Sequence, residues 1–172
     1  MDRLAVEKAK ELHRHHPGLS FPVDMEWLAR AEGCELLYWP FLGPVKEVKR
    51  GRWIGLAQGL NQAERRHLTA HGLAHHLLHS GNQLSFHGWQ KISLRKQERE
   101  AEECAAHILM PEEELAKLGN MPVWEIAEYF GVPEEVARQR LTEFATDREI
   151  VRWQTLGKDE LTSESHEWRN QK

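Results

Sequence analysis

The chain has 172 residues, of which 40% are hydrophobic and 29% charged, as in a globular protein of one domain with at most a small appendage. The net charge of −4 excludes a global basic field of the kind that attracts nucleic acid. No apolar run is long enough for a membrane span or a signal peptide, so we expect a cytoplasmic protein without membrane contact. The two cysteines, Cys34 and Cys104, indicate buried thiols in a reducing compartment.

The first 60 residues predict two helices followed by short strands. Apolar periodicity predicts helices over 4–13 and 25–31, and Asp24 is a plausible N-cap for the second. The segments 34–41 and 45–60 are short apolar runs broken by glycine and proline. They predict two or three strands joined by tight turns.

A long helix is predicted after Asn61. Asn61 and Glu64 have the spacing of a capping box, and Ser80-Gly81 is expected to end the helix. The following segment, 80–93, reads as a loop of about 14 residues, long enough to suggest function or mobility.

A second long helix is predicted over 94–110. Its buried line is expected to consist of small and apolar residues one turn apart: Ala101, Cys104, Ala105, Ile108 and Leu109. Pro111 ends this helix or starts the next turn.

Two short helices, 122–130 and 133–144, surround Gly131 and resemble a helix-turn-helix. The second begins with Glu134 and Glu135, at the end that would meet phosphates, so DNA binding is not expected. We expect this segment to complete the fold or to contact a protein partner. The polar tail from residue 151 is expected to be flexible.

Histidines recur every four residues in the long helix, at positions 67, 71, 75 and 79. At this spacing the four side chains lie on one face of the helix, and that face turns gradually around the helix axis. His71 and His75 have the separation of the two zinc ligands in the H-E-x-x-H motif, but Gly72 stands where that motif has glutamate. A histidine-rich helix without a metal is the alternative interpretation.

A third zinc ligand is expected from the next helix. Four carboxylates there qualify by chemistry: Glu98, Glu100, Glu102 and Glu103. The ligand should flank the buried line, and Glu100 lies beside Ala101 and one turn before Cys104. Glu103 is the next candidate.

Two motifs, RRHLTAHGLAHHLLH and EREAEECAAHILMP, resemble those of the ImmA/IrrE family of zinc metallopeptidases (COG2856 type) in the same order. The resemblance covers about residues 25–145. It implies an α+β, zincin-like minimal domain, with a small sheet against the metal-binding helix. It also implies a Zn²⁺ ion held by His71, His75 and Glu100.

The resemblance leads us to expect three regions: a metallopeptidase domain over 1–118, a helix-turn-helix-like segment over 119–150 and a tail over 151–172. It also implies a substrate, a Cro/CI-type helix-turn-helix repressor that controls stress, phage or mobile-element genes.

Gly72 departs from the family pattern at the catalytic position. The missing glutamate would take the proton from zinc-bound water, and losing such a base typically slows a reaction by about 10²–10⁴-fold. We therefore expect slow cleavage or none. His67, His79, His107 and Glu103 are candidates for a supporting role around the metal ligands.

Two further functions stay open. The chain is either an inactive, zinc-binding pseudopeptidase that docks a regulator, or a DNA-associated regulator that acts through residues 122–144. Arg138 and Arg140 are the basic residues that favour the second alternative.

Overall fold

The computed structural model describes residues 3–79, 91–119 and 121–146. The chain divides into two compact units, Met1–Ala137 and Arg138–Lys172. The first unit contains every labelled element, and in the second unit residues 138–146 are helical. The predicted tail, 151–172, lies outside the described residues, and the predicted boundary after residue 118 stays a prediction.

A three-stranded sheet forms one layer of the first unit. Its strands are β1 (Glu35–Trp39), β2 (Glu47–Arg50) and β3 (Trp53–Ala57), in the order β1-β3-β2. β1 runs parallel to the central strand β3, and β2 runs antiparallel to it. Both β2 and β3 contact the helix that covers one face of this sheet.

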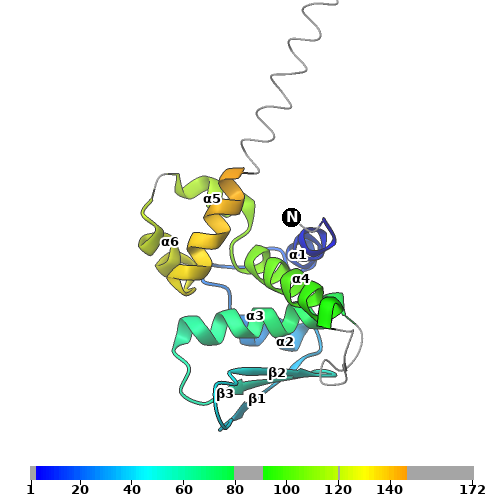
Figure 1. Cartoon of the computed structure of the whole chain (residues 1–172). Coiled ribbons are helices and arrows are strands. Elements are labelled where there is room, and N and C mark those ends of the chain that lie inside the picture. Colours follow the sequence, from blue (N-terminus) through cyan, green and yellow to red (C-terminus); the bar gives the residue numbers. More distant parts are fainter. Residues whose placement is uncertain (1–2, 80–90, 120, 147–172) are drawn as a thin grey trace, which may run out of the picture. The chain divides into compact units, whose positions relative to one another are not determined.

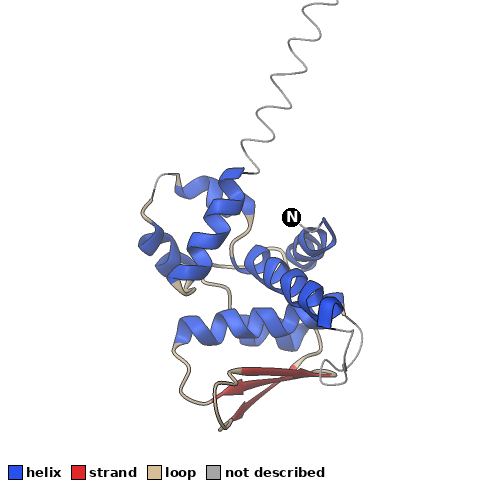
Figure 2. Cartoon of the chain, in the orientation of Figure 1, coloured by secondary structure: helices blue, strands red, loops and turns tan. Residues whose placement is uncertain are grey.

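Helix α3 (Gln62–Leu78) covers the sheet and is itself covered by α4 (Lys91–Leu109), as Figure 2 shows. α3 begins with the predicted capping box, in which the Asn61 side chain accepts from the Glu64 N–H and the Glu64 side chain accepts from the Asn61 N–H. Buried Ile54 and Leu56 of β3 lie on the sheet side of this packing. The expected mixed α+β architecture is confirmed.

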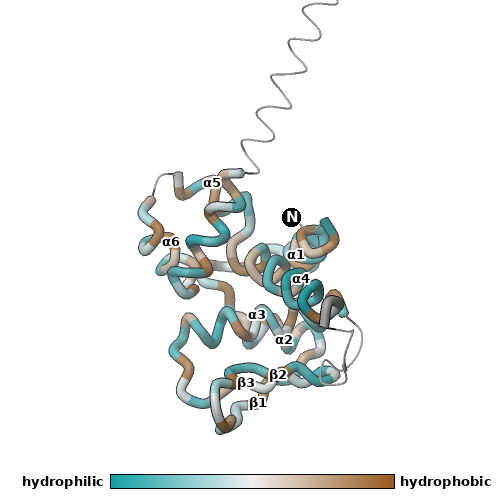
Figure 3. The backbone as a smooth tube through the Cα atoms, viewed as in Figure 1, coloured by the Kyte–Doolittle hydropathy of each residue, from teal (hydrophilic) through white to brown (hydrophobic). Residues whose placement is uncertain are grey.

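The predicted buried line of α4 is confirmed, because its five residues are all fully buried. The N-terminal end of the helix was predicted wrongly: residues 91–93 are already helical, so α4 begins one turn before residue 94. The rest of the predicted loop, residues 80–90, lies outside the described part of the chain. The carboxylates of α4 fall in its hydrophilic stretch, coloured teal in Figure 3, before the hydrophobic stretch that starts near Cys104.

The remaining helices complete the first unit: α1 (Arg3–His15), α2 (Met25–Ala31), α5 (Glu112–Leu118) and α6 (Val123–Phe130). α1 packs on α4, and α2 packs on α3 and β1 (Figure 1). The side chain of Asp24 caps α2 by accepting from the Trp27 N–H, as predicted. Within the described residues, no helix combines the length and apolarity that a membrane span needs.

Gly131 ends α6 in the left-handed conformation, with φ of 60°. Its carbonyl accepts a hydrogen bond from Nη1 of Arg66 at 2.5 Å, and Nε of Arg66 also donates to the Val23 carbonyl at 3.1 Å. A Cβ atom at position 131 would collide with the Arg66 guanidinium. Glycine is therefore needed here both for the backbone conformation and for the close approach of Arg66.

Candidate metal centre

Two histidines of α3 and one carboxylate of α4 converge on a common point. His71, His75 and Glu98 each offer a ligand atom, and these atoms all lie within 4.8 Å of one another. Nε2 of His71 is 3.5 Å from one Glu98 oxygen, and Nε2 of His75 is 3.4 Å from the other. The two imidazole rings meet edge to face, with centroids 4.6 Å apart.

This donor set fits a zinc ion. Zinc bonds of about 2.0–2.1 Å in a tetrahedron put neighbouring ligand atoms about 3.3 Å apart, close to the distances between Glu98 and the two histidines. Two imidazoles with one carboxylate are a ligand set of catalytic zinc sites, in which a fourth position stays open. The Glu98 side chain is 50% exposed, whereas His75 is buried, so solvent reaches the centre from the α4 side.

His71 is held from behind by a carboxylate of the sheet. Its Nδ1 lies 2.7 Å from Oε2 of Glu47, and the Glu47 side chain is only 9% exposed. A proton on Nδ1 donated to Glu47 leaves Nε2 of His71 as a lone pair directed toward Glu98 and His75. Burial lowers the pKa of His71, but the hydrogen bond to Glu47 and the charges of nearby carboxylates outweigh it and raise the pKa overall.

Glu98 is poised as an anion next to these histidines. The pKa of Glu98 lies below its usual value, chiefly because its carboxylate interacts with the imidazole of His75. An ionised carboxylate is the form that coordinates a metal, so the centre needs no deprotonation at this position.

Glu100, which the sequence favoured as the third ligand, contacts His79 and Lys96 instead of the histidine pair. One of its oxygens is 3.1 Å from Nε2 of His79, and the other is 3.3 Å from the ammonium group of Lys96. Glu98 and Glu100 flank the buried line of α4 on opposite sides, since successive helical residues turn by about 100°. The structure thus brings Glu98 to the histidine pair and directs Glu100 to the end of α3.

The predicted supporting histidines of α3 line the same helix face. Nδ1 of His79 is 3.2 Å from Nδ1 of His75, so His79 links Glu100 to the pair. His67 lies 2.8 Å from an oxygen of Glu102. The other oxygen of Glu102 is 3.9 Å from Nε2 of His71. The four histidines therefore face a row of carboxylates on α4.

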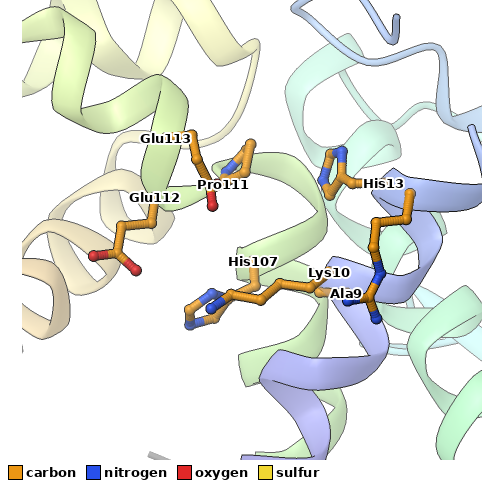
Figure 4. Close-up of a pocket in the computed structure, with 8 residues that line it drawn as sticks. Ala9, Lys10, His13, His107, Pro111, Glu112 and Glu113 are labelled. Carbon is orange, nitrogen blue, oxygen red and sulfur yellow. The ribbon is translucent and has the colours of Figure 1, made fainter. Parts of the chain in front are cut away.

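The other two predicted supporting residues lie away from the pair. His107 is buried and lines a separate cavity of about 300 Å³, with side chains of α1 and α5 around it (Figure 4). It lies about half a turn around α4 from Glu98. Glu103 is half-buried beside Cys104, and its charge adds to the burial that raises the pKa of that thiol.

Gly72 is buried against the sheet. A Cβ atom at this position would lie 2.7 Å from Cγ2 of Ile54 and 2.8 Å from Oε1 of Glu47, both closer than such atoms approach in proteins. The sequence pattern gave no sign of this, because Glu47 and Ile54 belong to strands that precede the helix. Glu47 is also the residue of the centre that motif spacing missed.

Comparisons with known proteins identify the family of this chain. The family model Peptidase_M78, described as an IrrE N-terminal-like domain, matches residues 30–142. The "uncharacterized immunity region protein 2" of Bacillus phage phi105 is 33% identical over 104 residues, covering 59% of this chain and 66% of the phage protein.

A solved structure shows a similar fold. A Mycobacterium tuberculosis transcriptional regulator superposes with a TM-score of 0.64 at 17% identity, over 82% of this chain and 56% of that one. This chain thus spans just over half of the mycobacterial protein and slightly less than two thirds of the phage protein.

Proposed function

The chain belongs to the Peptidase_M78 family of IrrE N-terminal-like domains, and from this membership we propose that it is a zinc-binding regulator of the metallopeptidase type. The match over residues 30–142 confirms the resemblance to the ImmA/IrrE family that the two sequence motifs indicated. A metallopeptidase-type protein is thereby established. The metal, the target and the rate of cleavage belong to the proposal.

The convergence of His71, His75 and Glu98 is the observation that carries the proposal. These residues would hold the ion, with Glu98 in the position that we first expected for Glu100. When bound, zinc would polarise a peptide carbonyl and lower the pKa of a water molecule toward about 7.

Cleavage by this centre is expected to be slow or absent. The position that carries the general base in the family motif is Gly72, which has no side chain. Among the described residues near the pair, Glu47 and Glu102 are already engaged with His71 and His67. A missing base costs about 10²–10⁴-fold in the proton-transfer step, so we propose that the chain mainly binds its target.

The proposed target is a helix-turn-helix repressor. The name of the phage relative refers to an immunity region, and that of the structural neighbour to transcriptional regulation. Both names support a regulatory setting, and the ImmA/IrrE resemblance implies a repressor of the Cro/CI type. The acidic net charge of −4 favours a protein target over direct DNA binding.

The test combines metal content with a binding assay. We expect one zinc per chain in the purified protein. We also expect the protein to bind a Cro/CI-type helix-turn-helix repressor without cutting it rapidly. The variant His75→Ala should lose the metal. A wild-type protein free of zinc after purification in zinc-containing buffer contradicts the metal site, and rapid repressor cleavage contradicts the proposed lack of turnover.

A further inference from the structure

The carboxylate of Glu47 touches two adjacent positions of α3 at once. Oε2 of Glu47 is 2.7 Å from Nδ1 of His71, and Oε1 lies 2.8 Å from the place where a Cβ atom of residue 72 would be. The side chain comes from β2, an edge strand of the sheet, and is almost entirely buried. No other described carboxylate contacts His71 from the side of the sheet.

We propose that Glu47 is the positioning residue of the metal centre: it orients His71 and takes the space that a side chain at position 72 would need. The orienting role of Glu47 rests on the proposed zinc site. Its role in filling the space beside residue 72 rests on packing alone. Histidine ligands of metals commonly donate their second ring N–H to a carboxylate, which fixes the tautomer and the ring orientation. Glu47 is placed for that role.

The packing half follows from what surrounds Gly72. Ile54 is fully buried on β3, and its methyl and methylene groups lie 2.7 and 3.1 Å from the Cβ position. Glu47 has a flexible side chain, but moving it away from Gly72 breaks its hydrogen bond to His71. A larger residue at 72 therefore disturbs the orientation of the neighbouring histidine. The absence of a side chain at Gly72 and the position of the Glu47 carboxylate therefore depend on each other.

The limited space around Gly72 also affects any attempt to restore the general base at this position. Gly72→Glu does not simply return a missing carboxylate, because the new side chain meets Ile54 and Glu47 at its first carbon. We expect this single change to disturb the centre without restoring cleavage.

The orienting role is tested by metal binding. We compare the apparent zinc affinity of Glu47→Ala and Glu47→Gln with matched changes at Glu35, a half-exposed strand residue that pairs with Arg52. Glu47→Ala should weaken zinc binding by about 10–100-fold and alter the visible spectrum of the cobalt-substituted protein. Glu47→Gln should lose less, because its amide oxygen still accepts from His71.

The changes at Glu35 should leave both readouts unchanged. Zinc affinity of Glu47→Ala within twofold of wild type, with an unaltered cobalt spectrum, overturns the orienting role. A uniform loss in all four variants overturns it as well, since a general weakening of the sheet would then explain the effect.

The packing role is tested in the metal-free protein by a double-mutant cycle. Gly72→Ala should lower the Tm, and the loss should be smaller in the Glu47→Ala background, because one of the two obstacles is gone. Equal losses in both backgrounds overturn the proposed competition for space. If wild-type protein binds no zinc, the proposed function fails, while this cycle still decides the packing half.

Discussion

Nε2 of His71 and Oε2 of Glu98 face each other at 3.5 Å across the contact between α3 and α4, although the residues lie in different sequence motifs. The proposed metal centre therefore depends on the packing of these two helices. Any change that shifts α4 along α3 separates the carboxylate from the imidazoles. We therefore expect metal binding and the packing of α3 on α4 to be coupled.

Zinc should stabilise the folded chain. An ion that binds only the folded state raises stability in proportion to the logarithm of its concentration over the dissociation constant, about 2.7 kcal/mol at a hundredfold excess. Thermal unfolding with added zinc should give a higher Tm than unfolding after chelation, and the difference should vanish in His75→Ala. A zinc-dependent rise of equal size in that variant would point to binding elsewhere.

Removing the helix cap should destabilise the fold without removing the centre. Asn61→Ala deletes the acceptor for the Glu64 N–H at 2.8 Å, a change that costs about 1 kcal/mol in typical helices. Chemical denaturation should detect this loss, and Asn61→Asp, which keeps the acceptor, serves as the matched control. Identical denaturation midpoints for Asn61→Ala and wild type would show that the cap contributes nothing.

Gly131→Ala should be more damaging than an ordinary glycine replacement. Position 131 has a positive φ and lies against the Arg66 guanidinium, whereas Gly33 has a positive φ but no atom near its Cβ position. Gly131→Ala should therefore lower the Tm more than Gly33→Ala does. Equal shifts in the two variants would mean that Arg66 moves aside at no cost.

Both thiols should resist alkylation in the folded protein. Burial raises the pKa of Cys34 to about 11 and that of Cys104 to about 12, so neither forms the reactive thiolate near neutral pH. Mass spectrometry after iodoacetamide treatment at pH 8 should find unmodified protein, and two modified cysteines after guanidinium unfolding. Rapid labelling of native protein would contradict the buried placement of these residues.

Much of this fold was predictable because local signals agree with the packing. Asn61 and Glu64 form the capping box that their spacing predicts, and the small and apolar line of α4 is buried as its period requires. The proposed zinc-ligand pair, His71 and His75, also follows from helical spacing, and the two side chains lie together in the structure.

The proposed third ligand could not be chosen by the same reasoning. Periodicity identifies the buried line of a helix but does not say which flank faces a particular neighbour. Glu98 and Glu100 lie on opposite flanks, and the way α4 packs on α3 brings Glu98 to the pair. The role of Glu47 was even harder to predict from the sequence, since its contact with His71 depends on how β2 pairs with β3 beneath the helix.

The most direct measurement of the proposed centre is the zinc affinity of two single variants, Glu98→Ala and Glu100→Ala, by competition with a chromophoric chelator. We predict that loss of the Glu98 carboxylate weakens zinc binding by at least tenfold, while loss of the Glu100 carboxylate, which contacts His79, changes it by only a few-fold. Strong loss on removal of Glu100 with none on removal of Glu98 would contradict this prediction.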